Sequence, residues 1–236
     1  MKQTVILSEK DVSNITHQKN SLTRLVYEEL IRRFMNEELV PGMLINRRLI
    51  AQELGVSVAP VLEALVQLQL EGFLESVPRK GTIVSPVKEK DALAQLLIRE
   101  SFECTAAKLY CGKKVRAFYD EFSSYAKWMD DMAKNSQFMS LTFKKAEISL
   151  HASLVNLCGM PIFTREFIRS IRVGVFSNIN RLSDRSFTER QNHAALIDKL
   201  TTDNPDEAME AVRSHLWSGK PLFDERYKKA ILGIQE

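Results

Sequence analysis

The stretch RRLIAQELGVSVAPVLEAL, from Arg47 to Leu65, decides the fold of the N-terminal part of this chain. Its apolar residues follow helical spacing on both sides of Gly55, which predicts helices at about 46–54 and 58–71. Glycine suits the turn between them because it adopts a positive φ at little cost. Two short helices joined by a tight turn are typical of a helix-turn-helix motif.

A hairpin is predicted directly after the second helix. The segment FLESVPRKGTIV, residues 73–84, has two short runs rich in β-formers around the tip Pro78-Arg79-Lys80-Gly81. Upstream, an apolar stripe at helical spacing begins near Ser21, and Pro41-Gly42 ends that helix. We therefore expect three helices plus a two-stranded wing over residues 21–86, which is a winged helix-turn-helix DNA-binding domain.

The chain on either side of this domain has a different character. Residues 1–20 show no periodicity, so we expect a flexible N-terminal arm. Residues 89–232 contain no strand pattern and predict an all-α antiparallel bundle. Glycine and proline separate its expected helices, which span about 89–111, 114–135, 138–158, 161–182, 185–202, 205–219 and 222–231.

Composition limits the class of protein. The 236 residues are 44% hydrophobic and 27% charged, as in soluble globular proteins. We find no membrane span and no secretory signal, and therefore expect a cytoplasmic protein. The three cysteines are odd in number and lack C-x-x-C spacing, which argues against a disulfide framework or a thiolate zinc site.

Charge does not by itself indicate a nucleic-acid partner. The net charge is +3, and residues 1–88 hold 11 Lys and Arg against 10 Asp and Glu. Contacts with DNA must therefore come from local clusters rather than from a strongly basic domain. Three such clusters are present, namely Arg32-Arg33, Arg47-Arg48 and Arg79-Lys80.

Three of the four histidines indicate a metal site. His151, His193 and His215 each share a helical stripe with apolar residues, so all three are expected to face the core. Glu147 lies four residues before His151 and leaves the same helix face. A carboxylate and three imidazoles suit a divalent transition metal ion such as Zn²⁺, Ni²⁺ or Mn²⁺. The alternative is that each imidazole is hydrogen-bonded within the core, and spacing alone does not exclude it.

The two halves together resemble the GntR family of bacterial transcription regulators, in the subgroup with an FCD domain. The likeness covers residues 20–220. It rests on PGMLINRRLIAQELGVSVAPVLEALVQLQLEGFLESVPRKGTIV, on EISLH at 147–151, and on HAALI…DEAM…H from His193 to His215.

The resemblance implies roles for residues of the bundle. It places the metal ligands on Glu147, His151, His193 and His215, with Glu147 standing where the family usually has Asp. It implies a small carboxylate effector bound against the metal, with Arg99 facing it. In such proteins effector binding repositions paired DNA-binding domains.

The same comparison exposes a departure in the second helix of the motif. Val58 and Leu62 stand where the family has base-contacting Arg, and Ala59 stands where it has Thr. Contacts to phosphates, thymine methyl groups and DNA shape are therefore expected to dominate. The expected DNA-binding residues are Arg47, Arg48, Ser57, Val58, Ala59, Pro60, Leu62, Arg79, Lys80 and Gly81.

We expect a ligand-responsive, homodimeric regulator that binds a palindromic DNA operator and is not an enzyme. Two alternatives remain open: a regulator that senses the metal itself, and a degenerate member that acts without specific DNA recognition. A metal-dependent hydrolase is disfavoured because no general base or nucleophile motif accompanies the histidines.

Overall fold

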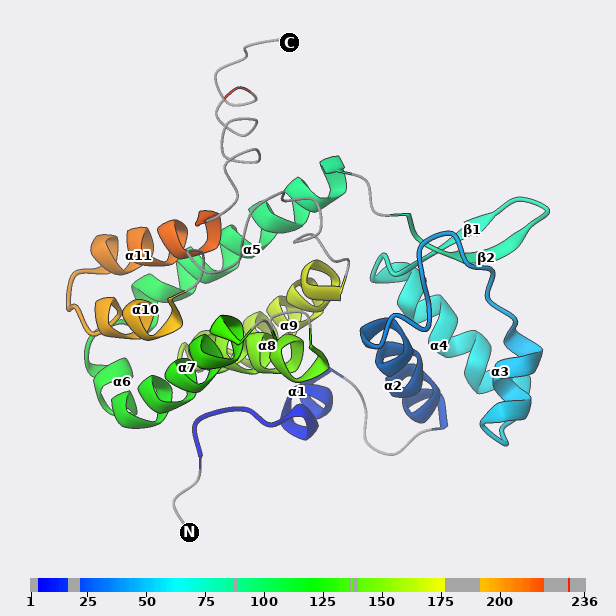
Figure 1. Ribbon diagram of the computed structural model, residues 1–236, viewed down its shortest axis with the longest axis horizontal. Helices are drawn as coiled ribbons and strands as arrows, with labels where there is room; N and C mark the ends of the chain where they lie inside the picture. Colours follow the sequence, from blue (N-terminus) through cyan, green and yellow to red (C-terminus); the bar gives the residue numbers. More distant parts are fainter. Residues whose placement is uncertain are drawn as a thin grey trace. The chain divides into compact units, whose positions relative to one another are not determined.

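The computed structural model describes residues 4–16, 22–86, 89–135, 137, 140–176, 192–218 and 229. The chain forms two compact units. The winged-helix unit comprises Thr16–Lys88, and the helical unit comprises Met1–Ile15 together with Glu89–Glu236. Figure 1 shows the elements of both units.

The winged-helix unit has the predicted architecture. It contains helices α2 (Leu22–Met35), α3 (Arg47–Glu53) and α4 (Val58–Leu70), followed by strands β1 (Leu74–Val77) and β2 (Gly81–Val84). The strands are antiparallel, with Leu74 opposite Val84 and Val77 opposite Gly81. An isolated bridge between Leu44 and Ile83 adds the preceding segment to the edge of the wing. The expected fold class is confirmed for this unit.

Local chemistry explains where these helices begin and how they pack. The side chain of Asn46 caps α3 by accepting hydrogen bonds from the backbone N–H groups of Arg48 and Leu49. Gly55 has a φ of 64°, as the turn between α3 and α4 requires. Helix α4 packs against α2 and α3. The core between them includes Val26, Leu30, Ile50, Val61, Ala64 and Leu68, all buried.

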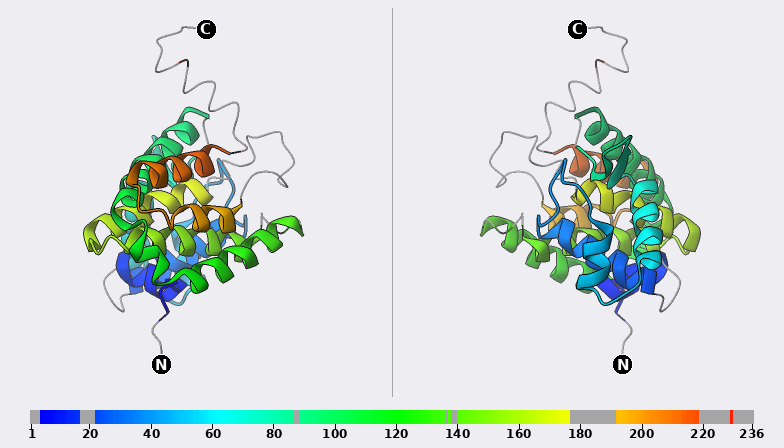
Figure 2. Two further views of the ribbon diagram at one scale, coloured as in Figure 1. Left: turned by 90° about the vertical axis from the view of Figure 1, so that its left-hand side faces the viewer. Right: turned by 90° about the vertical axis from the view of Figure 1, so that its right-hand side faces the viewer.

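The helical unit is all-α in its described part. Its helices include α5 (Glu89–Tyr110), α6 (Lys113–Arg116), α7 (Tyr119–Lys134), α8 (Leu141–Asn156), α9 (Pro161–Phe176), α10 (His193–Lys199) and α11 (Pro205–Trp217). Helix α5 packs against α8, α9 and α11, and α7 packs against α8 and α10. The left view of Figure 2 shows α10 beside α11, and these two helices are also in contact.

One predicted helix differs from the structure, and others lie wholly or partly outside the described residues. The helix expected at 114–135 is interrupted between α6 and α7, where Ala117 and Phe118 form a turn. Residues 177–191 lie outside the described part, so the helix expected at 161–182 is described only as far as residue 176, and the one expected at 185–202 only from residue 192. The short helix expected at 222–231 also lies outside it, apart from Lys229.

The N-terminal segment differs from the flexible arm expected for residues 1–20. Residues Glu9–Thr16 form helix α1, which Ser8 and Asp11 cap through reciprocal hydrogen bonds. The backbone N–H of Leu7 donates to Ser153 Oγ of α8 at 2.8 Å. The ammonium group of Lys145 pairs with Glu9 at 2.7 Å. These contacts with α8 order a segment that has no long apolar stripe of its own.

Candidate metal centre and DNA-binding surface

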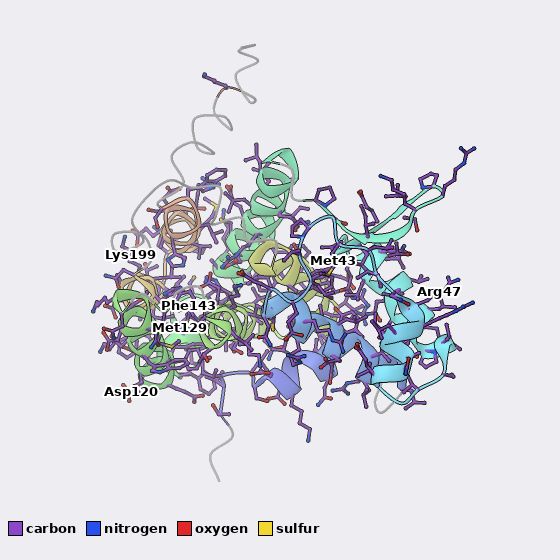
Figure 3. The ribbon with its side chains drawn as sticks, turned by 45° about the vertical axis from the view of Figure 1, so that its right-hand side comes forward. Met43, Arg47, Asp120, Met129, Phe143 and Lys199 are labelled. Atoms are coloured by element: carbon purple, nitrogen blue, oxygen red, sulfur yellow. The ribbon has the colours of Figure 1, made fainter. Side chains whose placement is uncertain are left out.

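The three predicted histidines meet in the core of the helical unit. His151 comes from α8, His193 is the first residue of α10, and His215 lies in the last turn of α11. Their ligand atoms all lie within 4.8 Å of one another, and each residue is at most 8% exposed. Phe143, labelled in Figure 3, lies beside His193 with 6.3 Å between the ring centroids.

Glu147 joins this cluster from one turn earlier on α8. Its Oε2 lies 3.1 Å from Nε2 of His193, and its Oε1 lies 3.5 Å from Nε2 of His151. Two donors that each bind one ion at about 2.1 Å lie roughly 3.0–3.4 Å apart for octahedral to tetrahedral angles. The separation of 3.1 Å from His193 falls within this range, and that of 3.5 Å from His151 lies just above it, so the carboxylate is placed to share an ion with both imidazoles.

Two imidazole nitrogens in the cluster lack a hydrogen bond. Among the described residues, Nε2 of His151 and Nε2 of His215 are buried and without a hydrogen-bond partner. An unsatisfied buried polar group costs about 1–3 kcal/mol. A divalent ion would use both lone pairs, and three imidazoles with one carboxylate form a donor set that suits zinc, nickel or manganese. The residues present thus fit a metal ion.

Two further carboxylates hydrogen-bond to the Nδ1 atoms of His151 and His193 and so orient these two rings. Glu103 Oε2 lies 2.5 Å from Nδ1 of His151, and Asp130 Oδ1 lies 2.8 Å from Nδ1 of His193. Asp130 also accepts hydrogen bonds from the backbone N–H groups of His193 and Ala194, each at 3.0 Å. These pairings direct both Nε2 atoms toward the centre, as outer carboxylates do around metal-binding histidines.

Sequence reasoning missed both outer carboxylates. Asp130 on α7 shows no local pattern that points to His193, which lies 63 residues later. Glu103 had a partial signal, because it follows Arg99 by one helical turn on α5.

Arg99, the expected effector contact, also lies at this centre. Its Nη2 donates to Glu147 Oε1 at 3.0 Å, and its Nε donates to Glu103 Oε1 at 2.5 Å. The side chain is only 13% exposed. The guanidinium group therefore bridges a candidate metal ligand and an outer carboxylate.

The acidic and basic groups of the centre shift one another's pKa values strongly. Burial raises the pKa of Glu147, but the charges of His151 and Arg99 outweigh it and hold that pKa well below its usual range. Burial lowers the pKa of His193, yet its hydrogen bonds to Asp130 and Glu147 raise it to about 9. The pKa of His215 is well below the ordinary value because of burial and the charges of the other two imidazoles. Glu147 is thus ionised and His215 offers a neutral ligand, whereas His193 would release its proton when an ion binds.

The winged-helix unit carries four exposed cations without an ion pair among the described residues. They are Arg47 and Arg48 at the start of α3 and Arg79 and Lys80 at the tip of the wing. Arg47 points away from the body of its unit in Figure 3. Free, exposed cations of this kind are what phosphate contacts require.

The third expected basic cluster is not available for such contacts. Arg32 pairs with Glu29 at 2.8 Å and with Glu38 at 2.7 Å. Arg33 pairs with Glu29 and with Glu53, each at 2.8 Å. Glutamates on the same and neighbouring segments therefore neutralise the Arg32-Arg33 cluster, and the expectation that it contacts DNA is not supported.

The wing presents Arg79 in an uncommon backbone conformation. Arg79 has a φ of 65°, and the backbone N–H of Lys80 donates to the carbonyl of Val77 at 3.0 Å to close the turn. A non-glycine residue in this region costs of order 1–3 kcal/mol and is found preferentially at functional sites. Gly81 follows at the start of β2 with a φ of 104°. The turn holds both basic side chains at the exposed tip.

The start of α4 offers few polar groups. Ser57 occupies the N-cap position, but its hydroxyl makes no capping hydrogen bond. Ala59 is exposed, Leu62 is 40% exposed and Val58 is partly buried. Pro60 lies on the buried face of α4, so this residue of the expected DNA-binding set faces the core instead.

No helix in the described part of the chain is long and apolar enough to cross a membrane.

Residues 22–84 match the bacterial regulatory proteins of the gntR family, and residues 95–217 match the FCD domain.

Two relatives that are described as transcriptional regulators are similar to this chain over most of its length. The chain is 26% identical, over 83% of its length and 88% of the relative, to a probable D-xylose utilization operon transcriptional repressor of Paenarthrobacter nicotinovorans. It is 32% identical, over 86% of its length and 84% of the relative, to an uncharacterized HTH-type transcriptional regulator of Streptomyces ambofaciens.

The fold agrees with that of the solved structure of McbR/YncC from E. coli. The TM-score is 0.65 at 19% identity, with 88% of this chain and 99% of that chain covered. The chain therefore belongs to the GntR family of bacterial regulatory proteins, and it is a transcription regulator with a winged helix-turn-helix and an FCD domain.

Proposed function

We propose that this regulator holds a divalent transition metal ion in its helical unit and responds there to a small carboxylate effector. The observation that carries the proposal is the pair of buried Nε2 atoms on His151 and His215 that lack a hydrogen bond and converge with His193, while Glu147 lies beside His151 and His193. Those four residues are the proposed ligands. Zinc is the first candidate, and nickel and manganese suit the same donors.

The ion would supply a positive charge and open coordination positions for the carboxylate of an effector. Arg99 lies beside a proposed ligand of the ion, because its Nη2 is 3.0 Å from Glu147 Oε1. A guanidinium group binds carboxylates through paired hydrogen bonds. We therefore assign to Arg99 the second contact with the effector, while Glu103 orients its Nε.

At the other unit, the proposed partner is a palindromic operator in double-stranded DNA. One α4 helix reaches only a few base pairs, whereas a two-fold dimer places two such helices on half-sites about one helical turn apart. The free cations Arg47, Arg48, Arg79 and Lys80 supply phosphate contacts. We propose a homodimer that acts in the cytoplasm, with no enzymatic role.

The pairing of Arg99 favours a second candidate, a regulator that senses the metal itself. Two carboxylates occupy the Nε and Nη2 of Arg99 in this structure, so effector binding would have to compete with them. A metal sensor needs no such competition. In that case removal of the ion would abolish DNA binding in the absence of any organic ligand.

The experiment compares these candidates on the full-length protein. Mass spectrometry of the denatured protein identifies any small acid that was bound, and fluorescence anisotropy then measures DNA affinity with that acid, with chelator, and with neither. The carboxylate proposal expects the acid to change the affinity by about 5-fold to 150-fold with the ion retained. A response to chelator alone supports metal sensing. An affinity that changes with neither treatment contradicts both.

A further inference from the structure

We infer that the exposed apolar side of α4 recognises thymine methyl groups in the major groove of an A·T-rich operator. This side, called here the α4 face, consists of Ala59, Leu62 and Val66. The inference rests on the proposed operator binding and specifies which chemical groups of the operator the protein contacts.

The α4 face does not contribute to the core. Leu62 is 40% exposed and Val66 is 53% exposed, whereas Val61, Ala64, Leu65 and Leu68 on the opposite side are buried. Residues three, four and seven positions apart lie on one side of a helix, so the three side chains form a continuous strip. The strip begins in the first turn of α4, which is the part of a recognition helix that contacts bases.

The long polar side chains of α4 are engaged within the protein. Glu63 Oε2 accepts a hydrogen bond from Thr23 Oγ1 at 2.5 Å, which turns its carboxylate toward α2. Nε2 of Gln67 donates to Glu71 Oε1 at 3.0 Å, and Nε2 of Gln69 donates to Ser76 Oγ at 2.8 Å. The amide pairs that commonly recognise adenine are therefore committed elsewhere.

The charges around the α4 face favour DNA as its occupant. Helix α4 packs against α3, whose first residues are the exposed Arg47 and Arg48, and against strand β1 of the wing, whose tip carries Arg79 and Lys80. An apolar strip in a unit that also carries free, exposed cations complements a groove whose floor bears methyl groups and whose edges are phosphates. Thymine is the only base with a methyl group in the major groove.

The test begins with selection of bound fragments from random DNA by the full-length protein. Each thymine of the selected site is then replaced by uracil, which removes the methyl group and keeps the base pairing. Burial of one methyl group corresponds to roughly a fourfold change in affinity. We expect about this loss at one or more positions in each half-site.

Two variants sharpen the result. Leu62→Ala shortens an exposed side chain, and it should remove the preference for thymine over uracil at its own position while affinity elsewhere is unchanged. Arg79→Ala is the control, because it should weaken binding to the thymine and uracil sites equally. The thymine-to-uracil comparison with the unmodified protein needs no variant, so misfolding of Leu62→Ala would not obscure it.

The outcomes separate this inference from the proposed function. A selected site that binds equally well with uracil throughout overturns the methyl contacts and leaves operator binding intact. Selection without any enriched sequence overturns both. If Leu62→Glu and Val66→Glu instead change the mass in sedimentation equilibrium, the α4 face is an interface with a second copy and the inference is wrong.

Discussion

The two candidate sites of this protein differ in the exposure and pairing of their charged side chains. The winged-helix unit keeps Arg47, Arg48, Arg79 and Lys80 exposed and free of ion pairs among the described residues. The helical unit instead buries an arginine, several carboxylates and three histidines in one connected network.

Buried and exposed charges contribute differently to the free energy of folding. Buried charges are costly, and removal of one partner leaves the others uncompensated. Exposed cations cost little and act through the field they present to a ligand. Substitutions in the buried network should therefore change stability and metal content together, whereas loss of the positive charge at one of the four exposed cations should lower DNA affinity without unfolding the protein.

His193→Ala should have the largest effect. It removes the shared partner of Asp130 and Glu147, and breaking a buried charged network costs about 3–5 kcal/mol of unfolding free energy. Urea denaturation followed by circular dichroism measures this loss. Glu166→Ala is the control, because Glu166 pairs with Arg165 and Arg169 at a half-exposed position. If the two variants lose the same unfolding free energy, the buried network does not contribute the stability that we assign to it.

Arg79→Gly should separate function from stability at the wing. Glycine relieves the positive φ of 65°, so we expect the unit to gain about 1 kcal/mol of stability. The same change removes a phosphate contact, so DNA affinity should fall for all sequences and the salt slope should decrease by about one. Thermal unfolding and a salt titration measure the two effects. A lower melting temperature or an unchanged slope would contradict this assignment.

Glu29→Gln should have the smallest effect. Hydrogen bonds from Arg32 lower the pKa of Glu29 to about 2; burial opposes this shift, and Arg33 adds to it. Because the pKa is lower in the folded state, the stabilisation is present above the ordinary value of 4.5 and is lost as pH falls toward 2. The variant should lose up to about 1 kcal/mol at pH 7 and progressively less below pH 4.5. If the difference in unfolding free energy between the variant and the unmodified protein instead increases below pH 4.5, the assigned role of Glu29 is wrong.

The sequence was sufficient for the winged-helix unit because its signals are local. Helical spacing around Gly55 and the hairpin tip at Arg79 depend on neighbouring residues only. The salt bridges that neutralise Arg32 and Arg33 also had a local signal, since Glu29 precedes them by three and four residues.

The candidate metal centre depended on long-range packing. Periodicity placed each histidine on a core face, but only the family resemblance implied that the three meet. Glu103 and Asp130 bind histidines 48 and 63 residues away, and no local pattern encodes such pairs. The order of residues 4–16 was missed for the same reason, because it comes from contacts with Glu121, Lys145 and Ser153.

Elemental analysis of the purified full-length protein tests the central claim most directly. We predict about one divalent transition metal ion per chain, lost in both Glu147→Ala and His193→Ala and retained in the control Glu166→Ala. Inductively coupled plasma mass spectrometry after dialysis against zinc, nickel and manganese measures all four proteins. Absence of metal from the unmodified protein, or full metal content in Glu147→Ala and His193→Ala, would contradict the proposed centre.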